Sequence, residues 1–197
     1  MKHTGRHWLG YSLVVMTAVA LTACADAPAG PARQAALAAG DAAGTFSRFP
    51  DLTGCEQLAA PEGSVLDLRA FAIGVQIYQW TGSTWNFVAP SATLYADEGL
   101  HGQVATHFGG PTWESNSGSR VVGTVLQRCT PDATAIQWLS LSAVPTGAGI
   151  FAHTTFIQRL YTVGGLAPST PGTTVGEIAQ VPYTAQYFFY KVPGAGK

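Results

Sequence analysis

Residues 181–191 read VPYTAQYFFYK, and this stretch decides the fold class. Its side chains alternate between two faces, one with Tyr183, Ala185, Tyr187 and Phe189 and the other with Thr184, Gln186, Phe188 and Tyr190. Successive side chains of a strand point to opposite sides of a sheet, so the run predicts a β-strand. We expect its aromatic rings to pack in the core and against neighbouring strands. Together with Trp80 and Trp85, the same rings also suit contact with a sugar or a lipid.

The chain after about residue 46 keeps this texture, with short β-branched and aromatic runs separated by Gly, Pro, Asn and Ser. The predicted strands are Val65–Ala72, Val75–Trp80, Thr84–Val88, Thr93–Tyr95, Gln103–Phe108, Arg120–Arg128, Ile136–Leu141, Ala152–Tyr161 and Val181–Lys191. Residues 80–85 look like a hairpin with its tip at 81–83. No stretch has convincing helical periodicity. The sequence therefore predicts an all-β fold, a single antiparallel β-sandwich or barrel-like domain over residues 46–197.

Charge is scarce in this chain. Only 11% of the 197 residues are charged, against about 25% in an average soluble protein. With 10 basic and 11 acidic residues the net charge is −1. High net charge with low hydrophobicity would be needed for a charge-driven disordered protein, and a basic face for a nucleic-acid binder. Neither class fits, and we expect no nucleic-acid partner.

The N-terminus is typical of an export signal. Lys2 and Arg6 precede an apolar stretch over residues 9–21 that is too short to span a bilayer comfortably. The stretch ends in LTAC at residues 21–24, which resembles the bacterial lipobox. The resemblance implies that residues 1–23 are a signal peptide, that Cys24 carries diacylglycerol, and that its amine is often acylated too, for example with palmitate. Ordinary secretion with cleavage after Ala25 or Ala27 is the alternative.

The predicted anchor sets the expected location. Several acyl chains on Cys24 would tether the protein stably to a membrane, and residues 24–45, rich in Ala, Gly and Pro, read as a flexible tether. Ala25 stands where an Asp would signal inner-membrane retention. In a Gram-negative cell we therefore expect an exported, membrane-anchored lipoprotein at the outer membrane or facing the periplasm.

Two cysteines remain if Cys24 carries lipid. An even pair in an exported domain most simply forms a disulfide, here between Cys55 and Cys129. Closing a loop of about 75 residues would stabilise the fold by about 4 kcal/mol. A reactive thiol or a metal site is the alternative, although the chain has no CxxC motif and neither Cys has a His nearby.

A series of motifs over about residues 60–191 resembles a known family. In order, they are residues 74–78 (GVQIY), Trp85 and Phe87, Pro90, Ala92 and Leu94, 107–114 (HFGGPTWE), 118–119 (GS), 122–123 (VG), 135–139 (AIQWL), 157–159 (IQR), 162–165 (TVGG) with Pro168, and 181–190 (VPYTAQYFFY). This order is similar to the domain-of-unknown-function family 3455 of exported bacterial and fungal proteins, whose activity is not established. Members commonly carry a Cys two places after GVQIY and another beyond the GG…P block. Here Trp80 and residues 168–171 (PSTP) stand in those regions, so that second disulfide is not expected.

Cofactor motifs are weak. Residues 147–152 (GAGIFA) match G-x-G-x-x-A, but a strand-like run follows and no acidic residue lies near position 170. We interpret them as a hairpin turn. His101, His107 and His153 match no compact zinc spacing. The sequence predicts no cofactor and no metal.

The segment His107–Glu114 is the first candidate site. An imidazole and a carboxylate around one Gly-Gly-Pro turn could form a general acid/base pair or grip a polar ligand. The structural interpretation, which we favour, places Trp113 in the core and has His107 hydrogen-bonded to a carbonyl.

Arg159 is the second candidate. It lies with Gln158 in an apolar strand, where an arginine needs a partner. Glu114 is the first guess for that partner, since a bidentate arginine–carboxylate pair suits a partly buried site. In a cavity, Arg159 would instead suit an anionic group.

The favoured hypothesis is a membrane-tethered β-domain that binds an envelope ligand (glycan, lipid or protein) without catalysis. Its candidate ligand-binding residues are His107, Trp113, Glu114, Gln158, Arg159 and Tyr183. One alternative is a small enzyme that uses His107 and Glu114 with Arg159 as anion holder. The other is a purely structural envelope protein, which predicts a filled barrel without a cavity.

Overall fold

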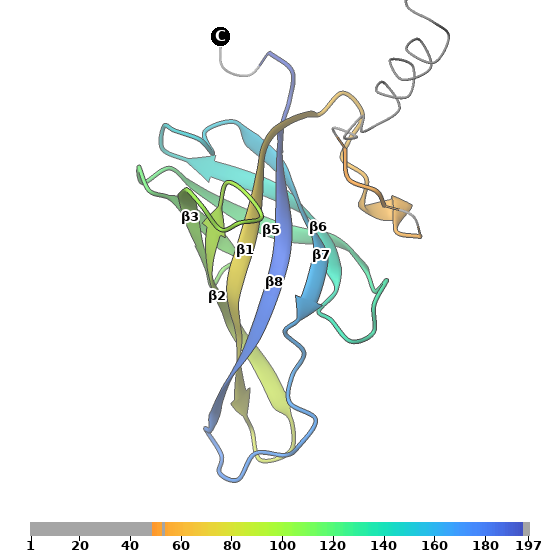
Figure 1. The fold of residues 1–197 in the computed structure, drawn as a ribbon, viewed down its shortest axis with the longest axis vertical. Helices are drawn as coiled ribbons and strands as arrows, with labels where there is room; N and C mark the ends of the chain where they lie inside the picture. The colour runs from red at the N-terminus through yellow and green to blue at the C-terminus, as the bar shows by residue number, and fades with distance from the viewer. Residues whose placement is uncertain (1–48, 53, 195–197) are drawn as a thin grey trace, which may run out of the picture. The chain divides into compact units, whose positions relative to one another are not determined.

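The structure is a computed structural model, and it describes residues 49–52 and 54–194. The predicted signal peptide, the predicted lipidation site Cys24 and the predicted tether lie outside these residues. The described chain forms a short 3-10 helix η1 (Glu56–Leu58) and eight strands (Figure 1). The strands are β1 (Val65–Trp80), β2 (Trp85–Tyr95), β3 (Gln103–Phe108), β4 (Thr112–Ser115), β5 (Arg120–Cys129), β6 (Trp138–Thr146), β7 (Thr154–Gly164) and β8 (Ile178–Lys191).

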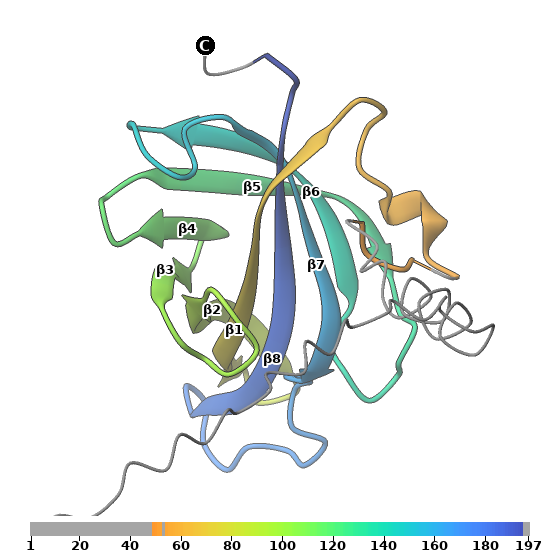
Figure 2. The same cartoon turned by 45° about the horizontal axis from the view of Figure 1, so that its top comes forward.

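The eight strands close into one antiparallel barrel. Each strand pairs with the next in sequence, and β8 returns to pair with β1 (Figure 2). The β1–β8 pairing is long, running from Val65 opposite Lys191 to Gln79 opposite Ile178. Closure removes the free edges that an open sheet would expose. The predicted all-β, barrel-like domain is confirmed.

The prediction that β1 is two strands was wrong. The interruption was placed at Ile73 and Gly74, but β1 runs through both. A Cβ on Gly74 would lie only 2.2 Å from the carbonyl oxygen of Ser91 on β2. The glycine therefore marks a close approach of two strand backbones inside the sheet, not a break in the strand.

Strand β2 was also predicted as two pieces, Thr84–Val88 and Thr93–Tyr95, but it is one strand that runs through Pro90. The residues of β2 before Ala92 pair with β1 and have no partner on the β3 side. A proline lacks the N–H that a central strand position would use, and it is tolerated where one side of the strand is unpaired.

Strand β4 was not predicted, because four residues are too few to show periodicity. Other boundaries shifted. Ile136 and Gln137, predicted to begin a strand, precede β6, which starts at Trp138. Residues 147–153 connect β6 to β7, as expected for a turn. Strand β8 begins at Ile178, three residues earlier than predicted.

Buried apolar side chains form two separate clusters. We call the one inside the barrel the inner core; it contains Leu94, Trp113, Leu141, Tyr187 and Phe189 among others. The other, the outer core, contains Cys55, Leu58, Phe156, Leu160, Phe188 and Tyr190. In β8 the alternation predicted from the sequence assigns Tyr187 and Phe189 to the inner core and Phe188 and Tyr190 to the outer one. The segment before β1 thus covers the outside of β7 and β8 (Figure 1).

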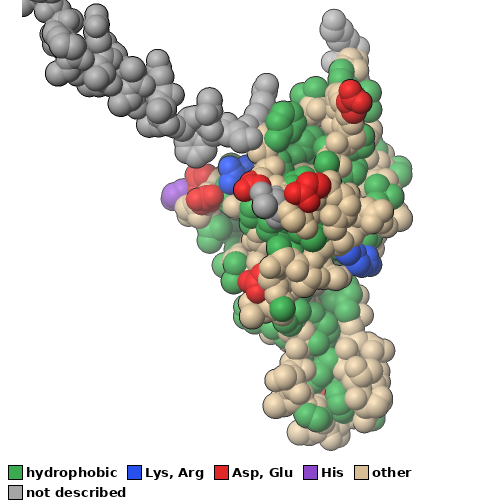
Figure 3. Space-filling view, turned by 90° about the vertical axis from the view of Figure 1, so that its right-hand side faces the viewer, with side chains coloured by type: hydrophobic (Ala, Val, Ile, Leu, Met, Phe, Trp, Pro, Cys, Tyr) green, Lys and Arg blue, Asp and Glu red, His purple; other side chains and the backbone are tan. Residues whose placement is uncertain are grey.

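A disulfide between Cys55 and Cys129 fastens this covering segment to the end of β5, so the predicted pairing is confirmed. The surface agrees with the scarce charge of the sequence. On the face drawn in Figure 3, charged side chains are few and scattered among apolar and uncharged polar groups.

Candidate functional site

A cavity of about 510 Å³ opens at one end of the barrel. The connections β1–β2, β3–β4, β5–β6 and β7–β8 all lie at this end, because consecutive strands of an antiparallel barrel alternate in direction. The lining residues are Gln76, Tyr78, Phe87, Val88, Pro90, His107, Gly109, Gly110, Pro111, Val125, Arg128, Ile136, Gln137, Leu139, Arg159 and Leu166. Eight-stranded barrels have an interior that can hold one small ligand.

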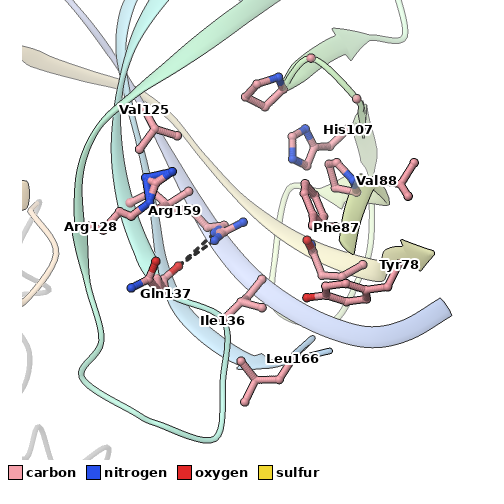
Figure 4. A pocket seen from close by; sticks show the side chains of 16 residues that line it. Tyr78, Phe87, Val88, His107, Val125, Arg128, Ile136, Gln137, Arg159 and Leu166 are labelled. Atoms are coloured by element: carbon pink, nitrogen blue, oxygen red, sulfur yellow. Dashed lines mark hydrogen bonds between the residues drawn. The ribbon is translucent and has the colours of Figure 1, made fainter. Parts of the chain in front are cut away.

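Two sides of the cavity differ in chemistry (Figure 4). One side, which we call the arginine wall, consists of Arg128, Gln137 and Arg159. The facing side, the aromatic wall, consists of Tyr78, Phe87 and Val88. Tyr78 is fixed by a hydrogen bond that its hydroxyl donates to the carbonyl oxygen of Gly165 at 2.6 Å.

Arg159 is half-buried and binds a backbone carbonyl. Its Nε and Nη2 donate to the oxygen of Gln137 at 3.3 and 2.8 Å. The predicted pair with Glu114 was wrong. Glu114 faces Arg120 directly across β4 and β5, and it accepts a hydrogen bond from Arg120 Nε at 2.9 Å. The alternation of β4, with Trp113 buried in the inner core, turns Glu114 to the outside of the barrel.

The cationic side chains fall into two groups. In the described part of the chain, the salt bridges of arginine and lysine are Arg69–Glu98, Arg120–Glu114 and Lys191–Asp67. The other two cations of residues 49–52 and 54–194 are Arg128 and Arg159, and both line the cavity. No Asp or Glu is among the lining residues. The cavity therefore has a positive wall, although acidic residues outnumber basic ones in the described chain.

His107 also lines the cavity, and the indole of Trp113 stacks on it with ring centroids 4.3 Å apart. Its Nδ1–H donates to the carbonyl oxygen of Thr112 at 2.9 Å, so the favoured structural interpretation of the sequence fits here. Burial lowers the pKa of His107 to about 3, since the charged imidazolium would lose its hydration. The ring is therefore neutral near pH 7, and Nε2 is an acceptor.

Gln76 is a lining residue that the site predictions missed. The residue is 2% exposed, and its Nε2 makes no hydrogen bond of normal geometry within the described residues, although its amide interacts with the hydroxyl of Tyr183. A buried amide in this state is unusual, because most buried polar groups are paired. The sequence held a signal: Gln76 and Tyr78 share one face of β1, and both face the cavity. Arg128 and Phe87 were missed as well.

The six predicted ligand-binding residues are divided by the barrel wall. His107 and Arg159 share the cavity, while Trp113 and Tyr183 lie in the inner core beside it. Burial raises the pKa of the Tyr183 hydroxyl, which keeps it protonated. Glu114 and Gln158 do not line the cavity.

Gln158 belongs to the outer core environment. Its Nε2 donates to the carbonyl oxygen of Leu58 at 2.7 Å, and its Oε1 accepts from the hydroxyl of Tyr190 at 2.7 Å. These bonds hold the segment before β1 against β7 and β8. The role that the structure gives Gln158 is therefore structural.

Trp80 and Trp85 lie at a separate, smaller hollow that residues 167–171 also line. Their ring centroids are 5.4 Å apart, and Trp85 Nε1 donates to the carbonyl oxygen of Thr170 at 2.9 Å. Gly172 packs tightly on Trp80, since a Cβ there would come within 2.6 Å of the indole. The two rings fasten the β7–β8 connection.

The histidines do not gather. His101 is exposed and bonds Asp97, with Nδ1 3.1 Å from Oδ1, whereas His153 lies in an exposed turn. Among residues 49–52 and 54–194, no three His, Cys, Asp or Glu side chains are placed to hold a metal ion. In that same part of the chain, no helix has the length and apolarity needed to cross a membrane.

Fold and cavity together define the class: a closed eight-stranded antiparallel barrel with a cavity at one end that two arginines line. Residues 61–191 match the model of the family described as "Protein of unknown function (DUF3455)". The chain belongs to this family, as the sequence motifs predicted. No curated protein and no solved structure matches the chain.

Proposed function

We propose that this protein is a non-catalytic binding module of the bacterial envelope that holds a small, largely apolar ligand in the barrel cavity. The observation that carries the proposal is the cavity itself. Its volume of about 510 Å³ falls within the range of small-molecule sites, and a few polar groups interrupt an otherwise mostly apolar lining. Among the envelope ligands considered, such a lining favours a lipid-like molecule over a glycan.

Exposed apolar side chains at the cavity support binding. Phe87 and Val88 are each 54% exposed, and Leu166 is 43% exposed, and all three line the barrel cavity. Apolar groups gathered in this way often mark a binding site. A purely structural protein predicts a filled barrel, and the cavity does not agree with that prediction.

Support for the enzyme hypothesis is weaker. It needs His107 and Glu114 in one place, but Glu114 points away from the barrel interior. No carboxylate lines the cavity to serve beside His107 as a general acid or base.

A lipid anchor on Cys24 is part of the proposal. Replacing Cys24 by Ala should release the protein from the membrane fraction. Unchanged fractionation of the variant would refute the anchor without touching the cavity.

The binding role is tested with 1-anilinonaphthalene, a neutral aromatic probe that fluoresces in apolar sites. We expect saturable binding of one probe per chain. Val125→Trp, which fills the cavity from β5, should reduce the affinity at least tenfold. The matched control is Val144→Trp on the outer surface, where the side chain is 67% exposed, and it should bind as the unsubstituted chain does. Absence of binding, or binding that Val125→Trp leaves intact in a folded chain, would overturn the proposal.

A further inference from the structure

We propose that the ligand is an amphipathic anion whose acidic group binds Arg159 and Arg128, and whose apolar body lies against the aromatic wall. This inference rests on the proposed function and adds the chemical class of the ligand. The acidic group is a carboxylate or an equivalent oxyanion, such as a sulfonate or a phosphate monoester.

The distribution of partners points to an anion. Every lysine and arginine of the described chain that lies away from the cavity has a carboxylate partner, whereas the two at the cavity have none there. Within the described residues, both cations that have no carboxylate partner therefore lie on one wall of the cavity. An anionic ligand would supply the missing counter-charge.

The geometry of Arg159 suits this role. The Gln137 carbonyl accepts from Nε and Nη2 and so fixes the plane of the guanidinium. A guanidinium carries five N–H donors, so donors remain for a ligand. Because Arg159 is half-buried, a charge-assisted hydrogen bond there is stronger than one at an exposed site.

Gln76 indicates that the ligand also carries hydrogen-bond acceptors. Its buried amide nitrogen makes no hydrogen bond of normal geometry within the described residues, although it belongs to a lining side chain. An unpartnered buried donor is unfavourable, and an acceptor on the ligand would relieve that cost.

The apolar body has its own surface. Phe87 packs edge-on against Tyr78, with ring centroids 5.8 Å apart, and both rings line the cavity. With the arginine wall on the facing side, a bound amphiphile has one orientation that satisfies both ends: acid toward Arg159, body toward Phe87 (Figure 4).

The test compares two probes that share one aromatic body. 1-Anilinonaphthalene-8-sulfonate carries a sulfonate, and 1-anilinonaphthalene does not. We expect the full chain to bind the anion about tenfold more tightly, as one charge-assisted bond would give. Arg159→Gln should bring this ratio close to one by lowering the affinity for the anion.

Arg120→Gln is the matched control, because it removes an outward-facing arginine that lies on Glu114. It should keep the preference for the anion. If Arg159→Gln fails to fold, as judged by thermal unfolding, Arg128→Gln serves as the second variant, and we expect about a threefold fall in the ratio.

The outcomes separate the two proposals. Equal binding of both probes by the unsubstituted chain overturns the anionic ligand and leaves the binding role standing. An unchanged ratio in folded Arg159→Gln does the same, as does an unchanged ratio in Arg128→Gln where Arg159→Gln does not fold. Failure of both probes to bind overturns the proposed function. Decanoate and decyl phosphate should compete more strongly than decan-1-ol, and comparing the two anions identifies which oxyanion binds better. Displacement by decan-1-ol as strong as by decanoate contradicts the inference.

Discussion

Two buried glutamines lie in the two cores of this barrel, and they are in opposite states. Gln158 is 1% exposed and has partners at both ends of its amide, Leu58 and Tyr190. Gln76 is 2% exposed, and its Nε2 makes no hydrogen bond of normal geometry in the described chain. The chain's own groups complete the amide of Gln158 in the outer core, whereas they do not complete that of Gln76 at the cavity. Gln158 therefore holds the structure, and Gln76, which lines the cavity, is available to a ligand.

Breaking the Cys55–Cys129 disulfide should have the largest effect on the outer core. The crosslink closes a loop of about 75 residues, and its loss should lower the free energy of unfolding by about 4 kcal/mol. Urea unfolding of Cys55→Ala/Cys129→Ala against the unsubstituted chain measures this. Because the bond lies in the outer core and neither Cys lines the cavity, 1-anilinonaphthalene should bind the folded variant normally. Loss of binding in a folded variant would show that the two regions are coupled.

The glutamines themselves give the sharpest test. Gln158→Leu leaves the Leu58 carbonyl and the Tyr190 hydroxyl without partners, which should cost about 3 kcal/mol in unfolding free energy. Gln76→Leu removes a donor that makes no hydrogen bond of normal geometry in the described chain, so the cost should stay below about 1 kcal/mol. Denaturant unfolding midpoints of the two variants and of the unsubstituted chain measure these losses. Equal losses in the two variants would mean that the amides of Gln76 and Gln158 contribute equally to the stability of the fold.

Low pH should reduce the free energy of unfolding through His107, which lies beside the cavity. Its folded pKa of about 3 lies below the ordinary value near 6.5, so the unfolded chain takes up the proton first. Stability is then complete above about pH 6.5 and falls as the pH drops toward 3. Between pH 7 and pH 5 the loss should be about 2 kcal/mol.

His107→Asn is the matched variant for this pH dependence. Asparagine retains an N–H near the position of Nδ1, which donates to Thr112, but it does not titrate. The variant should therefore lose little stability over the same pH range. A loss as large as that of the unsubstituted chain would assign the pH dependence to another group.

The sequence predicted more of the strands than of the site. Alternation identified most of the strands, and in β8 it separated the side chains of the two cores correctly. Gly74 was misinterpreted because its cause, the backbone of β2, lies far along the chain. The partner of Glu114 depends on the register of β4 on β5, which a four-residue strand does not reveal. The cavity depends on the sizes of side chains from most of the strands together, so no local sequence pattern predicts it.

The smallest effect should come from the pair that was first expected inside the site. Glu114→Gln removes the ion pair with Arg120 on the outside of β4 and β5, where both side chains are partly exposed. Solvent screens such pairs, so unfolding free energy should fall by about 0.5 kcal/mol. Binding of the anionic probe should not change, because Glu114 does not reach the cavity. An altered preference for the anion would mean that charge outside the barrel acts on Arg159. The cavity would then not be independent of the outer surface of the barrel.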